Sequence, residues 1–335
     1  MPVSHSRDFA QVLADLRDDE RPFPAFELYQ LSDLDKQDLD ALEAVWPEIP
    51  LERRRSTMQD LTEIAEANFE VNFGPVFRLG LEDDDAKVRA ASIGGLWEEE
   101  DTRLIAPFLD FLNHDPDVNV RAAAARALGR FVYLGEVEEI AEAHLRRIES
   151  ALLAVINDPQ NEPDLRRRAL EAVAFSGREE VSPLIEAAYL SSEPKYRASA
   201  VFAMGRSADK RWAPQVLAEL ENGAPELRFE AARAAGELEL PEAVPALARL
   251  AEDGDQQIRE AAIWSLGQVG GPEAREALGR LLEAADEEDR DFIEEALENL
   301  DFTDEVQDLA RIVLDDEGEF EDEDEDDEID KSLLN

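Results

Sequence analysis

The chain has 335 residues, of which 81 are acidic and 34 are lysine or arginine, giving a net charge of −47. With no cysteine, it can form neither a disulfide framework nor a thiolate metal site. The sequence has no apolar run of about 18 residues, so no membrane span is expected. The N-terminal MPVSHSRDFA lacks the pattern of a signal peptide, and we expect a cytoplasmic protein.

Residues 1–72 do not follow the periodic pattern of the rest of the chain. Leu31–Trp46 is expected to form a helix, with Ser32 and Asp35 spaced like a capping box, and Leu51–Phe69 forms a second. Two interpretations remain open: an N-terminal helical cap that covers the end of a repeat array, and a separate domain. We favour the cap, because an open array needs a covered end.

A repeat follows, and arginine marks it. The last five marked arginines are separated by 31 residues each, and the two earlier gaps are 32 and 45. We call these residues the ladder arginines: Arg89, Arg121, Arg166, Arg197, Arg228, Arg259 and Arg290. A proline series has the same period: Pro75, Pro107, Pro183, Pro214 and Pro245. Two residue types on one period indicate internal repetition.

Each repeat is expected to be a pair of short helices. The proline suits the first turn of the first helix. The ladder arginine lies on the second helix, where apolar residues recur at helical spacing, as in Ile258, Ala262, Ile263 and Leu266. Such a pair buries its apolar faces only by stacking on the next pair. The sequence therefore predicts an all-α solenoid of about seven right-handed helix pairs in one row over residues 73–302, followed by a terminal helix over 303–314.

An acidic residue precedes most ladder arginines by four positions: Asp85, Asp117, Glu162, Glu193, Asp255 and Asp286. Ala224 breaks this series. Such a carboxylate is placed to cap the second helix and to reach an arginine of its own or of the adjacent repeat. We interpret this Asp/Glu–Arg ladder as structural, and not as a catalytic or phosphate-binding row.

The units resemble HEAT repeats, in particular the short type found in phycobilisome lyases and their relatives. The pattern D-x-x-x-R-x-x-A-x-x-x-L-G of that family is matched by DVNVRAAAARALG (Asp117–Gly129) and DQQIREAAIWSLG (Asp255–Gly267). The resemblance covers about Phe73–Leu300 and implies the fold. It also implies an alternative function, as a lyase-like or chaperone-like protein that handles a chromophore or its carrier protein.

Two segments interrupt or end the repeat. The 14 extra residues between Arg121 and Arg166 fall near Phe131–Arg147, whose pattern is helical, so we expect a lengthened helix. Residues 315–335 hold 13 acidic side chains and one lysine, and we expect them to be disordered. This acidic tail either keeps the protein soluble or contacts basic segments of partners.

The sequence offers little catalytic chemistry. Its three histidines are His5, His114 and His144, and none is followed by glutamate, the dipeptide that the di-iron hydroxylase built from HEAT-like repeats requires. Nucleotide-binding glycine motifs and the nucleophile elbow are also absent. We therefore expect no catalytic residue, no metal site and no cofactor.

The second helices offer a binding surface. Positions one, five and nine after each ladder arginine face away from the stack, and we call them the second-helix face. Its predicted partner-binding residues are Arg126, Arg130, Arg167, Phe202, Arg206, Phe229, Arg233 and Trp264. Arginine and aromatic residues are common anchors in protein interfaces. The alternative is that the aromatic residues pack between repeats.

These observations favour a non-catalytic scaffold, monomeric by itself, that holds a protein partner in a groove along the second helices. The lyase-like function that the resemblance implies is the alternative. A nucleic-acid binder is disfavoured because the strongly negative charge repels phosphates and no lysine-rich face is present.

Overall fold

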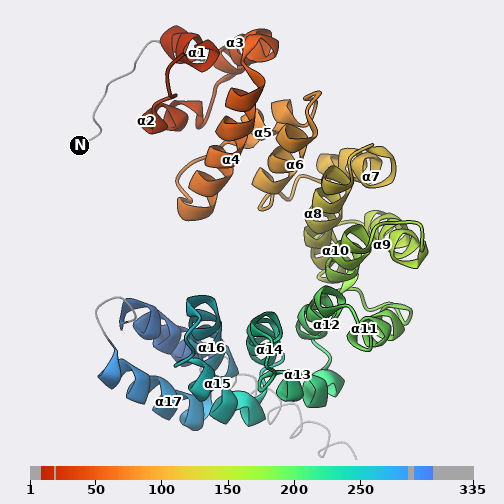
Figure 1. The fold of residues 1–335 in the computed structure, drawn as a ribbon, viewed down its shortest axis with the longest axis vertical. Helices are drawn as coiled ribbons and strands as arrows, with labels where there is room; N and C mark the ends of the chain where they lie inside the picture. Colours follow the sequence, from red (N-terminus) through yellow and green to blue (C-terminus); the bar gives the residue numbers. More distant parts are fainter. Residues whose placement is uncertain (1–8, 19, 286–289, 305–335) are drawn as a thin grey trace, which may run out of the picture. The chain divides into compact units, whose positions relative to one another are not determined.

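The computed structural model describes residues 9–18, 20–285 and 290–304. Every regular element in these ranges is a helix, so the predicted all-α class is confirmed (Figure 1). The chain divides into two compact units, Met1–Ala187 (unit 1) and Ala188–Asn335 (unit 2). The acidic tail, His5 and Asp286 lie outside the described residues.

Within the first 72 residues, the described part forms helices and 3₁₀ turns. These are α1 (Phe9–Arg17), α2 (Ala25–Leu28), the 3₁₀ turns η1 (Tyr29–Leu31) and η2 (Trp46–Glu48), α3 (Lys36–Val45) and α4 (Leu51–Ala67). The predicted capping box is wrong, because α3 begins three residues later than Ser32 would require. Asp35 caps α3 by accepting from the Asp38 N–H at 2.9 Å. Ser32 Oγ instead accepts from the Asn72 N–H at 2.9 Å and so joins two loops.

Seven helix pairs follow within the described residues. The first helices are α5 (Gly74–Gly80), α7 (Ile105–His114), α9 (Glu142–Asn157), α11 (Val181–Tyr189), α13 (Ala213–Glu219), α15 (Val244–Leu250) and α17 (Gly271–Ala284). The second helices are α6 (Ala86–Gly95), α8 (Val118–Glu136), α10 (Pro163–Val173), α12 (Pro194–Arg206), α14 (Pro225–Glu237), α16 (Gln256–Val269) and the helical residues 290–304. The 3₁₀ turns η3 (Thr102–Leu104), η4 (Lys210–Trp212) and η5 (Pro241–Ala243) lead into α7, α13 and α15.

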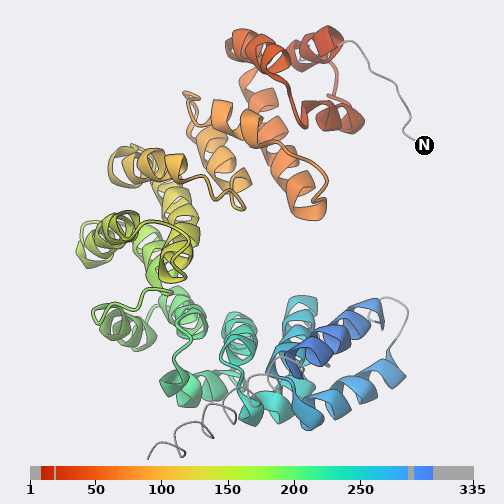
Figure 2. The same ribbon diagram turned by 180° about the vertical axis from the view of Figure 1, so that it is seen from behind.

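The pairs build two layers inside each unit. In unit 1, α6, α8 and α10 pack on one another in succession, α4 packs on α6, and α7 contacts α9 in the other layer. In unit 2, α12, α14 and α16 form one layer, while α15 and α17 contact each other in the second. Figures 1 and 2 show these layers from opposite sides. Because α4 packs on α6 as α6 packs on α8, α4 serves as the second helix of a degenerate pair.

The repeat pattern reflects the register of the second helix. Each described second helix from α6 to α16 carries its ladder arginine as the fourth helical residue. The apolar set that follows is buried; in α16, Ile258, Ala262, Ile263 and Leu266 are each at most 2% exposed. The glycine that ends the motif lies where two second helices approach most closely. A Cβ on Gly205 would lie 2.8 Å from the Ala234 Cα.

The insertion lengthens helices, as its pattern predicts. Helix α8 has 19 residues and α9 has 16, whereas α6 and α7 have 10 each. Phe131 in the extended part of α8 is buried and meets Phe108 of α7 edge-on, with ring centroids 6.4 Å apart. The added turns therefore extend the core of unit 1.

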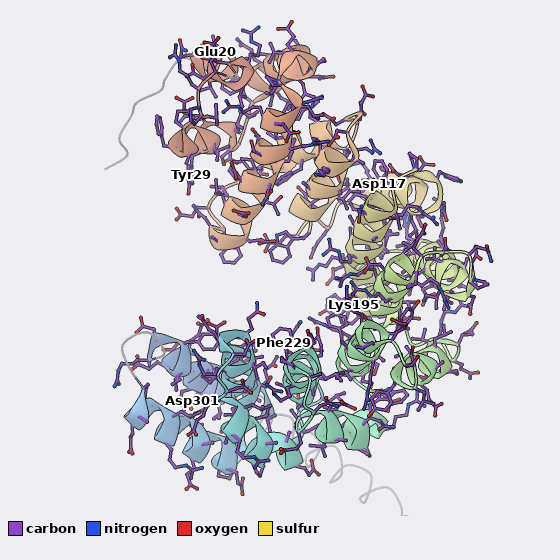
Figure 3. The ribbon with its side chains drawn as sticks, in the orientation of Figure 1. Glu20, Tyr29, Asp117, Lys195, Phe229 and Asp301 are labelled. Carbon is purple, nitrogen blue, oxygen red and sulfur yellow. The ribbon has the colours of Figure 1, made fainter. Side chains whose placement is uncertain are left out.

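Removing the cap of α8 should destabilise the protein. Asp117, labelled in Figure 3, accepts from the Asn119 N–H at 2.8 Å. Asp117→Ala is expected to lower the free energy of unfolding by about 1 kcal/mol, because a helical N–H loses its acceptor. Urea denaturation followed by circular dichroism measures this. Glu162→Ala is the matched control: Glu162 occupies the same position before α10 but makes no cap bond, so the expected loss is below about 0.5 kcal/mol. Equal losses in both variants would contradict the capping role.

Candidate functional site

The described acidic residues four positions before the ladder arginines all lie at the N-cap. Asp85, Asp117 and Asp255 accept from the N–H two residues further on. Glu162 and Glu193 make no cap bond, so the expectation that they cap is wrong. Glutamate is not among the preferred N-cap residues, which have shorter side chains.

Some of the ladder arginines reach forward to the next pair. Arg89 donates through Nε and Nη2 to the two carboxylate oxygens of Asp115, both at 3.0 Å. Arg228 donates through Nε to Asp253 at 3.1 Å. These acceptors lie six residues before the next ladder arginine, two positions earlier than the predicted acidic series. Sequence reasoning missed them, although the Asp-x-Asp spacing at 115/117 and 253/255 was a visible signal.

The other ladder arginines also contact side chains or backbone carbonyl oxygens. Arg121 bonds Asn161 Oδ1 and Arg166 bonds the Ile156 carbonyl oxygen, at 2.9 and 2.8 Å. Arg197 pairs with buried Glu219. Arg259 donates to the Asp253 carbonyl oxygen at 3.0 Å, and Arg290 lies 3.9 Å from Glu294. Most of these contacts join a ladder arginine to a turn or to another helix, and the structural interpretation of the row stays a prediction.

Five of the eight predicted partner-binding residues lie in unit 2, on α12, α14 and α16. The Arg233 guanidinium lies over the ring of Phe202 at 5.5 Å and over that of Phe229 at 5.7 Å. The Arg206 guanidinium also lies over the Phe202 ring, at 5.4 Å. Phe229 is visible on α14 in Figure 3. We call Phe202, Arg206, Phe229, Arg233 and Glu237 the unit 2 aromatic cluster.

Glu237 holds the two arginines of this cluster. Its Oε1 lies 3.3 Å from Arg206 Nε and 3.7 Å from Arg233 Nη2. Trp264 continues the row on α16, where its ring stacks on Phe292 with centroids 6.5 Å apart and its residue surface is 36% exposed. The phenylalanines and arginines are half-buried, so the cluster is an ordered surface of paired groups.

Burial raises the pKa of the Glu237 carboxyl, and the charges of Arg206 and Arg233 oppose that shift. A carboxyl whose pKa is raised by folding binds protons more readily in the folded state. The cost of ionising it is therefore absent below the unfolded pKa and complete above the folded pKa.

We expect the wild type to gain stability relative to Glu237→Gln as the pH falls from about 7 to about 5. The difference in free energy of unfolding between the two proteins reports on this carboxyl alone. Protonation of the other acidic groups changes the stability of both proteins equally. Urea denaturation at both pH values measures the effect. Parallel stability profiles would show that Glu237 titrates normally.

The three remaining predicted residues, Arg126, Arg130 and Arg167, lie in unit 1 on α8 and α10. Arg130 pairs with Glu100, and Arg167 lies 2.5 Å from Asp164 and 3.4 Å from Glu171. Arg126 is exposed and makes no hydrogen bond or ion pair with any residue in the described ranges. Of these three arginines, Arg130 and Arg167 are therefore paired with carboxylates, whereas Arg126 is not.

No group of three or more histidine or acidic residues suited to a metal ion occurs among the residues that the structure describes. His114 contacts Asp110, with Nδ1 and Oδ1 2.9 Å apart, on the exposed surface of α7. Among the described helices, none is long and apolar enough to cross a membrane.

Comparison with known proteins identifies the repeat. A family model described as HEAT repeats matches residues 75–147, 181–255 and 213–300, which together make up more than half of the chain. Comparison with curated protein sequences yields no match.

Solved structures that resemble the chain include the following three. The complex of CpcE and CpcF of phycocyanin lyase from Nostoc is 17% identical, covering 69% of this chain and 94% of that one, with a TM-score of 0.44. Human deoxyhypusine hydroxylase is 20% identical, covering 79% and 96%, with a TM-score of 0.35. Yeast importin-beta (Kap95p) is 14% identical, covering 98% and 50%, with a TM-score of 0.46.

Proposed function

The chain belongs to the HEAT-repeat family, and on that premise we propose that it is a non-catalytic scaffold that binds a segment of a partner protein on the second-helix face of unit 2. One observation carries this proposal: Phe202, Phe229, Arg206 and Arg233 form a continuous stack across adjacent helices. Trp264 extends it with an exposed indole. Arginine, tryptophan and other aromatic residues supply most of the binding energy in many protein interfaces.

The cluster is organised before a partner arrives. Arg233 lies against two aromatic rings and near Glu237, and Arg206 lies against one ring and near the same carboxylate. Ordering a long side chain on binding costs about 0.5–1.5 kcal/mol, and side chains already held in place avoid much of that cost. An exposed tryptophan beside ordered groups is a suitable anchor for an apolar side chain.

The charge of the protein suggests the chemistry of the partner. Within the cluster, two arginines lie near Glu237, and Glu230 lies 3.9 Å from Arg233, so the face is close to neutral. Apolar and aromatic side chains therefore suit it best. The chain as a whole carries −47, which attracts positively charged partners. We accordingly propose a partner segment with apolar anchor residues next to a basic stretch, the latter a match for the acidic residues 315–335.

Trp264→Ala tests this function. After a partner has been identified by affinity capture from the native cell, its purified segment is titrated against the variant by calorimetry. We expect a loss of about 2 kcal/mol or more in binding free energy, because an anchor side chain is removed. Stability should change by less than about 1 kcal/mol, because the indole is exposed.

Trp97→Ala is the matched control, since Trp97 is 45% exposed but lies in unit 1. It should leave affinity for the segment unchanged. Equal affinity of wild type, Trp264→Ala and Trp97→Ala would overturn the proposed role of this face. A large loss of stability in Trp264→Ala with normal binding per folded molecule would show instead that the indole serves packing.

A further inference from the structure

Unit 1 carries a second, different surface, built by arginines on α8 and α10. Arg126 and Arg130 come from α8, and Arg167 and Arg168 from α10. Three of them have carboxylate partners: Arg130 has Glu100, Arg167 has Asp164 and Glu171, and Arg168 has Glu171 at 2.6 Å. Arg126 has neither a hydrogen bond nor an ion pair in the described part of the chain.

Close packing of α8 on α10 brings these charges together. A Cβ on Gly129 would lie 3.0 Å from the Ala172 Cα, so the two backbones nearly touch. Arg126 lies one turn before Gly129, and Arg168 lies one turn before Ala172. In this region Asp164 and Glu171 pair with Arg167 and Arg168, so the guanidinium of Arg126 is a positive charge in excess, on a chain whose net charge is −47.

The environment of Arg126 is unfavourable for its charge. Partial burial lowers the pKa of its guanidinium, and the positive charges of Arg168 and Arg167 lower it further, whereas Glu171 and Asp164 raise it. Arg126 is nevertheless exposed and keeps its charge, because arginine does not lose its proton in proteins. A solvent-accessible guanidinium that lies near other positive charges is stabilised when an anion replaces the water bound to it, because the hydrogen bonds between two charged groups are strong.

Aromatic side chains lie along the same face. Positions 126, 130 and 133 have the i, i+4, i+7 spacing that places side chains on one side of a helix. Arg130 lies over the Tyr133 ring at 5.5 Å, and Tyr133 meets Phe175 with ring centroids 5.2 Å apart. Tyr133 is 38% exposed, so it offers apolar surface on the same side of α8 as Arg126, about two turns further along the helix.

We propose that Arg126, supported by Arg168 and Tyr133, binds a carboxylate side chain, Asp or Glu, in a peptide segment of a partner protein. The guanidinium donates to the two carboxylate oxygens as a fork, and Tyr133 contacts the neighbouring apolar atoms of the segment. A single carboxylate fits the single excess charge. A polyanion such as nucleic acid is repelled by the overall charge of the protein. The site lies in unit 1 and does not depend on the unit 2 aromatic cluster.

The test uses the full chain and an array of short fluorescent peptides. Each peptide has glutamate, glutamine or phosphoserine at its centre, flanked by varied combinations of glycine, lysine, leucine and tyrosine. We expect glutamate peptides to bind the wild type about tenfold more tightly than their glutamine counterparts, which is the usual effect of a hydrogen-bonded charge. Arg126→Gln should reduce this preference to less than about twofold, and Arg126→Lys should leave an intermediate preference, because it keeps the charge but loses the fork.

Arg146→Gln is the matched control, because it removes the same charge from an exposed site on α9. It should retain the full preference for glutamate. Thermal melting of each variant verifies folding, and Arg126→Gln should melt at or above the wild-type temperature because repulsion between like charges is removed. The proposal is overturned by equal binding of glutamate and glutamine peptides, by binding of neither, or by a preference that survives Arg126→Gln. Binding of phosphoserine peptides alone would identify a phosphate site and also overturn it.

Discussion

Asp83→Ala is expected to lower the free energy of unfolding by about 3–5 kcal/mol, the typical cost of breaking a buried ion pair by removing one partner. The Asp83 side chain is fully buried and accepts three hydrogen bonds, from Trp46 Nε1 at 2.7 Å, Arg54 Nη1 at 2.8 Å and the Asp85 N–H at 2.8 Å. Alanine would leave an indole N–H and a guanidinium without their acceptor. It would also weaken the attachment of α4 and η2 to the first helix pair, where the bond between Arg55 and Asp85 would remain.

Hydrogen exchange of the α3, α4 and α5 amides, combined with urea denaturation, measures this effect and locates it. Asp84→Ala is the matched control, because Asp84 is the exposed neighbour and contacts Arg89 through its backbone carbonyl only. The control should change stability by less than about 0.5 kcal/mol. A loss below about 1 kcal/mol in Asp83→Ala would mean that water replaces the carboxylate at little cost.

Gly205→Ala is expected to destabilise the protein by about 1–3 kcal/mol, although alanine is the better helix former by about 1 kcal/mol. The new methyl group would lie 2.8 Å from the Ala234 Cα and 2.6 Å from Glu237 Oε2. The first contact is with backbone, so α12 and α14 must move apart. That movement would also disturb the arginines that Glu237 holds.

The matched control, Gly279→Ala, is expected to change the free energy of unfolding in the opposite direction. Gly279 lies inside α17, and a methyl group added there would have no other atom within 4 Å beyond its own helical neighbours. Gly279→Ala should therefore raise the free energy of unfolding by up to about 1 kcal/mol, from helix propensity alone. Thermal and urea denaturation of both variants measure the contrast. Stabilisation by both substitutions would show that the helices have room to separate.

Much of the fold could be predicted because the same residue types recur at the same helix positions in successive pairs. The prolines mark first helices: Pro75, Pro107, Pro183, Pro214 and Pro245 each lie within the first three residues of one. The arginine and glycine positions fix the second helix in the same way. The start of α3 was missed because Ser32 and Asp35 are both good caps, and only tertiary contacts decide between them.

The partners of individual side chains were harder to predict, because they depend on the register between successive pairs. Arg126 and Arg167 look alike on the second-helix face, yet only Arg167 has acidic residues one turn away on its own helix. The partners of Glu219 were equally hard to predict. It is 1% exposed and accepts from Tyr189, Arg197 and Asn222, which no local pattern reveals. The role of the second-helix face stays a prediction.

The forward reach of the arginines determines where this protein could be cut and rejoined. Arg54, Arg89 and Arg228 each bond an aspartate in the turn of the following pair, at Asp83, Asp115 and Asp253. A module excised at the boundaries that the sequence period suggests would leave behind the acceptor of its own arginine. The segment that can be duplicated or transplanted with its acceptor runs from a second helix through the following first helix to the turn that ends that helix. Duplications with these boundaries would keep each of these guanidinium groups with its aspartate acceptor.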